Sequence, residues 1–132
     1  MRLRPYQPGE EPKLWDLYLR LGKTGQSRQQ WLTRLQCSIP FVVEYDRQVI
    51  GYANLDNDGV IDHFFVRENW QGRGVGTLLM EKMHKQAANQ RLSVLTALVC
   101  RESQSFFARW GFVLEPGQAV GADNAFMRKN LR

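Results

Sequence analysis

The sequence is poor in cysteine and has no long hydrophobic run. Its 132 residues include two cysteines, Cys37 and Cys100, which are too few and too widely separated to indicate a disulfide framework or a cluster of metal ligands. We therefore expect no metal site and two reduced, buried thiols. No apolar stretch approaches the length that crosses a bilayer, and the first residues form no apolar leader. These absences favour a soluble, cytoplasmic protein with no membrane partner.

Clustered charge is also lacking. The chain has 18 Lys and Arg against 13 Asp and Glu, a formal net charge of +5. The basic residues are scattered, however, and form neither a long basic run nor a zinc-finger spacing nor an aromatic RNA-binding strand. A polyanionic small molecule would suit this excess charge as well as a nucleic acid would. Nucleic-acid binding is therefore a minor alternative.

The N-terminal part of the chain predicts two amphipathic helices. Apolar residues recur at helical spacing from Leu14 to Leu21, and Gly22 stands where such a helix would end. Ser27 followed by Gln30 is typical of a capping box, which starts a second, short helix. That helix should end before Pro40, because proline disfavours a helical residue in front of it.

The rest of the chain alternates strand-like and helix-like segments. The predicted strands are 41–45, 48–55, 60–66, 92–99, 112–115 and 124–131, and the predicted helices are 75–87 and 103–110. The first two strands should form an antiparallel hairpin, and the apolar run 92–99 should pair in parallel with 60–66. Because 43% of the residues are hydrophobic, the chain can bury one core. We expect one domain over residues 1–132, of the α/β or α+β class.

A glycine-rich turn joins the strand over 60–66 to the next helix. It reads Gln71, Gly72, Arg73, Gly74, Val75, Gly76. Its backbone N–H groups and the helix N-terminus can cradle a phosphate, and Arg73 adds a positive charge. It is not a Walker loop, since no Lys precedes Thr77, and it does not fit the dinucleotide fingerprint, which needs a small residue at Thr77 and a later acidic partner. The alternative is an ordinary strand-to-helix connection.

This turn resembles the pyrophosphate loop of the GCN5-related N-acetyltransferases (GNATs), which has Gln or Arg, two residues, Gly, one residue, then Gly or Ala. Gln71, Gly74 and Gly76 fit that pattern. Three further stretches are similar to the family's fourth strand, second signature and last strand, namely 62–69, 105–112 and 127–131. The resemblance implies a GNAT-like fold: a mixed, mostly antiparallel sheet of about six to seven strands, with a parallel fourth and fifth strand pair and about four helices.

The resemblance also implies a cosubstrate, acetyl-CoA, whose pantetheine arm would lie between the splayed fourth and fifth strands. The residues expected to bind it are Phe64, Phe65, Val66, Gln71, Gly72, Arg73, Gly74, Val75, Gly76, Thr77, Ser103, Phe106 and Phe107. The implied reaction is direct attack by a primary amine on the thioester, with backbone donors stabilising the oxyanion and no metal.

Two residues are candidates for catalysis. Asp62 occupies a strand position where many family members carry a Glu, and it is either the base for the amine or a carboxylate that caps a loop or pairs with an Arg. His63 should point to the other strand face, as a second base or as a satisfied structural histidine. His84 is expected on the solvated helix side. Phe107 replaces the family's usual Tyr acid, so the thiolate leaves unaided or Cys100, Ser103 or Ser105 substitutes.

The acceptor stays open between a small amine, a peptide terminus and a lysine. The first two helices and the hairpin should line its groove, which indicates Trp15, Tyr18, Trp31 and Tyr52 as wall or core residues. A homodimer is an open alternative for the assembly. The main alternative function is a non-catalytic module that binds CoA or acetyl-CoA.

Overall fold

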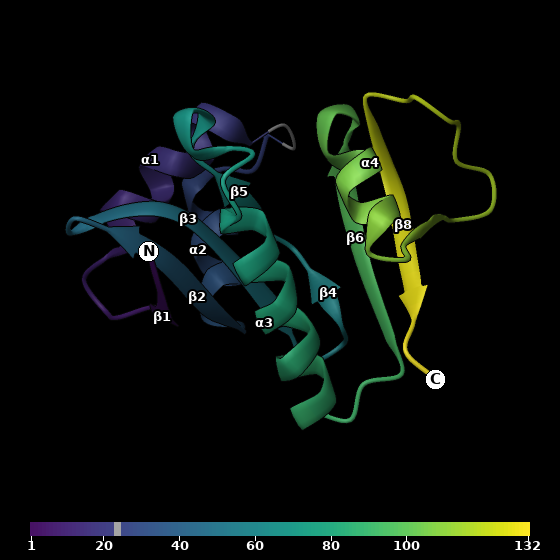
Figure 1. The fold of residues 1–132 in the computed structure, drawn as a ribbon, viewed down its shortest axis with the longest axis horizontal. Helices are drawn as coiled ribbons and strands as arrows, with labels where there is room; N and C mark the ends of the chain where they lie inside the picture. The colour runs from purple at the N-terminus through teal and green to yellow at the C-terminus, as the bar shows by residue number, and fades with distance from the viewer. Residues whose placement is uncertain (23–24) are drawn as a thin grey trace.

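Two sheets form the centre of the computed structural model, which describes residues 1–22 and 25–132 (Figure 1). The first sheet is antiparallel, in the order β1 (Arg2–Pro5), β2 (Ser38–Tyr45), β3 (Gln48–Asp56), β5 (Phe64–Val66). The second has the order β4 (Val60–Ile61), β6 (Val94–Cys100), β8 (Asn124–Asn130), β7 (Val113–Leu114), and its β4–β6 pair is parallel. This mixed α/β architecture confirms the predicted fold class.

Four α-helices and one 3-10 turn complete the described chain. They are α1 (Glu11–Leu21), α2 (Arg28–Gln36), the turn η1 (Glu68–Trp70), α3 (Val75–Asn89) and α4 (Arg101–Arg109). The predicted capping box starts α2: Ser27 Oγ accepts from the Gln30 N–H at 3.2 Å, and Gln30 Oε1 accepts from the Ser27 N–H at 2.9 Å. The predicted helices are therefore all present, with ends that differ by a few residues.

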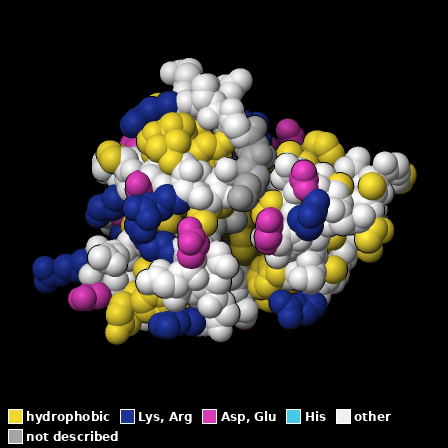
Figure 2. Space-filling model, turned by 90° about the horizontal axis from the view of Figure 1, so that it is seen from above, with side chains coloured by type: hydrophobic (Ala, Val, Ile, Leu, Met, Phe, Trp, Pro, Cys, Tyr) yellow, Lys and Arg dark blue, Asp and Glu magenta, His cyan; other side chains and the backbone are white. Residues whose placement is uncertain are grey.

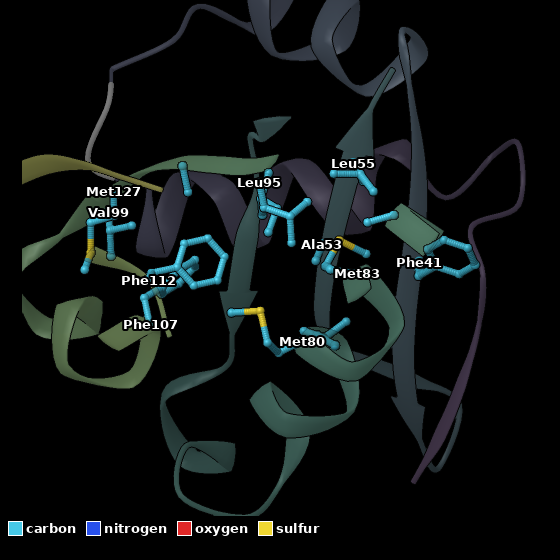
Figure 3. Close-up of a cluster of buried hydrophobic side chains, with 14 of the residues drawn as sticks. Phe41, Ala53, Leu55, Met80, Met83, Leu95, Val99, Phe107, Phe112 and Met127 are labelled. Atoms are coloured by element: carbon cyan, nitrogen blue, oxygen red, sulfur yellow. The ribbon is translucent and has the colours of Figure 1, made fainter. Parts of the chain in front are cut away.

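Two buried clusters lie on opposite faces of the first sheet. One contains α1 and α2 side chains, such as Leu14 and Trp31, packed on Val42 and Tyr52. The larger one joins both sheets to α3 and α4, and Figure 3 shows its side chains between the strands and helices. Helix α3 thus holds the two sheets together through a shared apolar core.

Three predictions of strand boundaries need correction. The N-terminal strand β1 was not predicted, although Leu3 pairs with Val43 at the edge of the sheet. Strand β2 begins at Ser38 and contains Pro40, whose carbonyl accepts the Tyr6 N–H at 3.1 Å. The proline is tolerated because Asn54, opposite it on β3, donates its N–H to the His63 carbonyl. The N–H that Pro40 lacks would therefore face away from β3, just beyond the last residue of β1.

The third correction concerns residues 60–66, which do not form one strand. The chain leaves the second sheet after Ile61 and joins the first at Phe64, so the parallel pairing with β6 holds only for Val60–Thr96 and Ile61–Ala97. The physical reason is Asn54 on β3, whose side-chain Oδ1 accepts the N–H groups of Asp62, at 3.2 Å, and His63, at 2.6 Å. These bonds replace part of the regular ladder.

Two predictions of burial were wrong. Both cysteines are free thiols, but Cys37 is exposed and Cys100 is half-buried. His84 is not on the solvated side of α3: it is half-buried, donates from Nδ1 to the Met80 carbonyl at 2.8 Å, and lies 2.8 Å from Lys129 Nζ on β8. None of the helices in the described part of the chain is sufficiently long and apolar to traverse a bilayer.

Candidate functional site

The divergence of β5 from β6 opens a cleft of about 600 Å³ between the two sheets. One wall is β5 with the glycine turn and the start of α3, and the other is the end of β6 with α4. Figure 2 shows this hollow between the two halves of the molecule, with hydrophobic side chains at its floor and acidic groups on both sides. The cleft can therefore hold a long ligand with an apolar middle part.

The backbone of β5 faces this cleft with every second residue. The Arg67 N–H donates to the Ile50 carbonyl at 2.8 Å, and the Asn54 N–H donates to the His63 carbonyl at 3.1 Å. Since antiparallel ladders alternate, Phe65 is bonded to β3, whereas the N–H groups of Phe64 and Val66 point away from it. This half of β5 is an open strand edge, able to pair with an extended ligand.

The glycine turn ends in a helix N-terminus that no described side chain caps. The first helical bond of α3 runs from the Leu78 N–H to the Gly74 carbonyl at 3.1 Å, so the N–H groups of residues 75–77 have no partner within the helix. Gly74 has a φ of 90°, which a side chain would strain. A Cβ at Gly76 would stand 3.2 Å from the Phe106 ring. The arrangement is an anion cradle beside an aromatic wall.

Charges of both signs surround the cradle. Arg20, from the end of α1, and Arg109, from the end of α4, line the cleft together with Glu68 and Glu102. Arg73 does not line it: its guanidinium lies over the Trp70 ring, 5.2 Å from the centroid. Gln71 binds the turn to the strand edge, because its Nε2 donates to the Val66 carbonyl at 3.1 Å.

Ten of the thirteen residues predicted to bind a cosubstrate line the cleft: Phe64, Phe65, Val66, Gln71, Gly72, Gly74, Gly76, Thr77, Ser103 and Phe106. The exceptions are Arg73, Val75, which is fully buried under the turn, and Phe107. Phe107 is 3% exposed and its ring contacts Phe112 and Phe64, at centroid distances of 5.1 and 5.3 Å, as part of the core in Figure 3.

A smaller cavity of about 50 Å³ continues the cleft toward the start of β5, between Asp62 and the β6 residues 97–100. It shares Leu21, Phe64, Phe65, Cys100 and Ser103 with the cleft, and its polar lining includes Asp62 and Asn124. Cys100 and Ser103 stand together at the start of α4, with Sγ and Oγ 3.5 Å apart. A reacting atom at this junction would have a carboxylate on one side and a hydroxyl and a thiol on the other.

Asp62 is held by an arginine. Arg34 of α2 donates from Nε to Asp62 Oδ2 at 2.9 Å and from Nη2 to Asp56 Oδ2 at 2.8 Å. Hydrogen bonds to Asp62 and Asp56 raise the pKa of Arg34, so the guanidinium stays charged. The pairing with an Arg was one of the alternatives for Asp62, and it leaves this carboxylate beside the small cavity.

His63 lies in a ring of aromatic side chains and is 1% exposed. Its Nδ1 is 3.3 Å from Asn54 Nδ2, and its Nε2 is 3.2 Å from Gln26 Oε1. Because Asn54 Oδ1 already accepts two backbone N–H groups, Nδ2 is the donor, so the imidazole proton sits on Nε2. Burial lowers the pKa of His63 to about 4, and the ring is neutral at pH 7.

A family profile for the acetyltransferase (GNAT) domain matches residues 23–127. The chain belongs to the GNAT acetyltransferase family. Among its relatives, the L-methionine sulfoximine/L-methionine sulfone acetyltransferase of Pseudomonas aeruginosa is 29% identical over 126 residues, covering 80% of this chain and 73% of the relative.

Solved GNAT structures share the fold. A GNAT family acetyltransferase from Elizabethkingia anophelis with acetyl-CoA bound superposes with a TM-score of 0.77 at 17% identity, covering 98% of this chain and 97% of that one. The ribosomal-protein-alanine N-acetyltransferase of Brucella melitensis gives a TM-score of 0.74 at 22% identity, over 99% of this chain and 100% of that one. The structural match therefore extends over nearly the whole chain.

Sequence reasoning missed several residues around this GNAT site, including Arg20 and Glu102 of the cleft lining and three residues that act through distant contacts. Arg34 carries the ion pairs of Asp62, Gln26 contacts His63, and Asn54 holds the break between β4 and β5. For Asn54 a signal exists, because it is the one amide side chain in the apolar run Val49–Leu55. Nothing in the sequence links Arg34 or Gln26 to the residues that they contact.

Proposed function

We propose that this protein is an N-acetyltransferase that transfers the acetyl group of acetyl-CoA to a primary amine by direct attack. The observation that carries the proposal is the cleft itself. The outer edge of β5, which no other described strand pairs, leads at one end to the uncapped N-terminus of α3 and at the other to Asp62. An extended pantetheine arm would pair with the strand edge, and a diphosphate would end at the helix N-terminus.

The residues of the cleft fit such a cosubstrate. The N–H groups of residues 75–77 lack helical partners, and a Cβ at Gly76 would stand 3.2 Å from the Phe106 ring, so glycine leaves room there for a ligand. Phe64 and Val66 offer backbone groups to the arm, while Phe65, Ser103 and Phe106 line its path. Arg20 and Arg109 supply positive charge to a polyanion, and Arg73 would do so only after leaving Trp70.

At the acyl end, the free Phe64 N–H is the proposed donor to the oxyanion that forms when the amine attacks. A C–N bond forms, the C–S bond breaks, and the amine must lose a proton. Most of the amine is protonated at pH 7, whether it is an alkylamine with a pKa near ~10.4 or a peptide α-amine with a pKa of about 7.7–8.0. Asp62 is the better supported of the two base candidates, since it lines the cavity. His63 is 1% exposed and carries its proton on Nε2, so its support is weaker.

The departing thiolate has no tyrosine here. Phe107 offers no proton, and Ser105 is exposed and outside the cleft lining. Ser103 and Cys100 line both the cleft and the small cavity, so we propose that the Ser103 hydroxyl donates a hydrogen bond to the sulfur, which leaves as a thiolate and takes its proton from solvent. A thiol pKa of about 8.5 makes such modest assistance sufficient.

The names of two relatives guide the choice of acceptor. One is named for acetylating L-methionine sulfoximine and L-methionine sulfone, and the other for acetylating an alanine of a ribosomal protein. An α-amine is a group that these acceptors can have in common. We therefore propose an α-amine, either of a small amino acid or of a peptide terminus, ahead of a lysine side chain. The amine would approach from the Asp62 side of β5.

A binding titration followed by an acceptor panel tests the proposal. We expect acetyl-CoA to bind, and one α-amine of the panel to release free thiol. In Asp62→Asn we expect kcat to fall about 10²-fold or more with little change in acetyl-CoA affinity, as for a lost general base. Equal affinity for CoA and acetyl-CoA with no turnover on any amine would favour the second candidate, a non-catalytic CoA-binding module. Two observations support that candidate: Asp62 is paired with Arg34, and the buried Phe107 has no hydroxyl to donate. No binding at all would overturn both.

A further inference from the structure

Asn54 is a fully buried polar residue near the C-terminal end of β3, next to the point where the chain changes sheets. Its backbone N–H makes a regular ladder bond to the His63 carbonyl at 3.1 Å. The return bond of that pair is absent from the ladder, because the His63 N–H donates instead to Asn54 Oδ1 at 2.6 Å. The same oxygen accepts the Asp62 N–H at 3.2 Å.

This single amide therefore satisfies two backbone donors that a continuous strand would direct elsewhere. With both N–H groups bound on β3, residues 62 and 63 cannot extend the parallel pairing of β4 with β6. The chain turns toward the first sheet, and β5 starts at Phe64 with its outer edge unpaired. The position of the Phe64 N–H is thus fixed one residue beyond the Asn54 clamp.

The other end of the amide is also fully used. Asn54 Nδ2 donates to Ser38 Oγ at 3.0 Å and faces His63 Nδ1 at 3.3 Å. His63 in turn reaches Gln26 through Nε2, at 3.2 Å. Since Oδ1 is committed to two N–H groups, the amide cannot flip without losing them, and the imidazole keeps its proton on Nε2.

We propose that Asn54 is a positioning residue for acyl transfer: its clamp on residues 62 and 63 sets both the Phe64 N–H and the Asp62 carboxylate at the acyl end of the cleft. The inference rests on the proposed function, and it adds a residue that touches neither substrate. The diphosphate end of the cleft, at residues 72–77, lies at the other end of β5 and is independent of this clamp.

Three variants separate the parts of the clamp. Asn54→Ala removes the two hydrogen bonds that Oδ1 accepts from the N–H groups of residues 62 and 63, and the two contacts of Nδ2 with Ser38 and His63. Asn54→Asp keeps an oxygen for the two N–H groups but places a second oxygen against His63 Nδ1, which should draw the imidazole proton to that nitrogen. Ser38→Ala is the matched control, because it removes a partner of Nδ2 and leaves the Oδ1 bonds in place.

We expect kcat of Asn54→Ala to fall by about 10²-fold, the usual cost of misplacing reacting groups by an ångström. The dissociation constant for CoA should change less than about threefold, because distant sites act independently. Asn54→Asp should keep more activity than Asn54→Ala and show the His63 proton on Nδ1 in its ¹⁵N NMR spectrum. Equal kcat in Asn54→Ala and Ser38→Ala would overturn the proposal.

Amide hydrogen exchange of the wild-type protein tests the clamp without any variant. The His63 N–H should exchange as slowly as the ladder amides of β3, and rapid exchange would overturn the inference even if Asn54→Ala fails to fold. These outcomes are distinct from failure of the proposed function. If the wild-type protein binds no CoA, the proposed function is wrong, but the exchange and NMR results still test whether Asn54 holds residues 62 and 63. If the wild type and Asn54→Ala are equally active, the proposed function stands and only the role of Asn54 is wrong.

Discussion

Replacing Gly76 by alanine should separate the folding role of the glycine turn from its proposed binding role. Gly76 is the second residue of α3, where alanine is favoured over glycine by up to about 1 kcal/mol. The new Cβ would stand 3.2 Å from the end of the Phe106 ring, which has to move by a few tenths of an ångström. Moving the ring off its rotamer costs about 0.5–1.5 kcal/mol, so gain and cost nearly cancel and the stability should stay within about 1 kcal/mol of the wild type.

Binding should respond in the opposite way. A methyl group at residue 76 would take up space between the helix start and Phe106, which both line the cleft, and we expect it to keep the diphosphate from one of its N–H donors. Losing one charge-assisted hydrogen bond costs about 1.5–3 kcal/mol. That corresponds to a CoA dissociation constant raised by about tenfold or more. Isothermal titration with CoA and urea denaturation of the same sample measure the two effects.

Gly117→Ala is the matched control. Gly117 has a φ of 87° and open space around its missing Cβ, and it does not line the cleft. Alanine there should lower the stability by about 1–2 kcal/mol through backbone strain and leave CoA affinity unchanged. If Gly76→Ala bound CoA as tightly as the wild type, the turn and the uncapped start of α3 would not be the diphosphate cradle.

Two further predictions concern the charged and titratable groups near the acyl end. Burial lowers the pKa of His63 to about 4, below its ordinary value of 6.5. The unfolded chain therefore binds more protons between these values, so stability is complete above about pH 6.5 and falls by about 2 kcal/mol between pH 7 and pH 5. Urea denaturation at both pH values should show this loss in the wild type and much less of it in His63→Gln. If the free energy of unfolding fell equally between pH 7 and pH 5 in both proteins, His63 would not be a neutral, buried histidine. Replacing Arg34 by Gln leaves Asp56 and Asp62 without the cation between them, and since the Arg34 side chain is 37% exposed the expected loss is only about 1 kcal/mol. Salt should reduce this loss by screening the two carboxylates, and a loss that is the same at low and high salt would contradict the electrostatic explanation.

The parts of the site that the sequence predicted are those built from neighbours in the chain. The glycine turn is followed at once by α3, so its three glycines and the helix N-terminus could be identified together from residues 71–77. The capping box at Ser27 and Gln30 is local in the same sense. A local pattern needs no knowledge of the tertiary structure, because the atoms that interact are within a few residues of one another.

The parts that were missed or corrected depend on contacts between distant segments. The strand over 60–66 has the composition of one continuous strand, and only an amide on the neighbouring β3 divides it. Arg34 reaches Asp62 across 28 positions of sequence, and Lys129 reaches His84 across 45. Strand β1 is short and gains its place only by pairing with β2. Such features depend on the tertiary structure, and no local sequence pattern predicts them.

Phe107 shows how packing and chemistry are linked at this site. Its ring lies between Phe112 and Phe64, with centroids at 5.1 and 5.3 Å, and Phe64 also meets Phe106 at 5.8 Å. A buried tyrosine hydroxyl needs a hydrogen-bond partner, whereas phenylalanine packs among these rings without one. The aromatic contacts join β5 to α4 across the floor of the cleft, so they set the distance between its walls. Phe107, which departs from the family pattern, thus provides no proton donor and contributes to the apolar floor. Ser103 of α4 and Cys100 at the end of β6 are then the hydroxyl and the thiol at the acyl end.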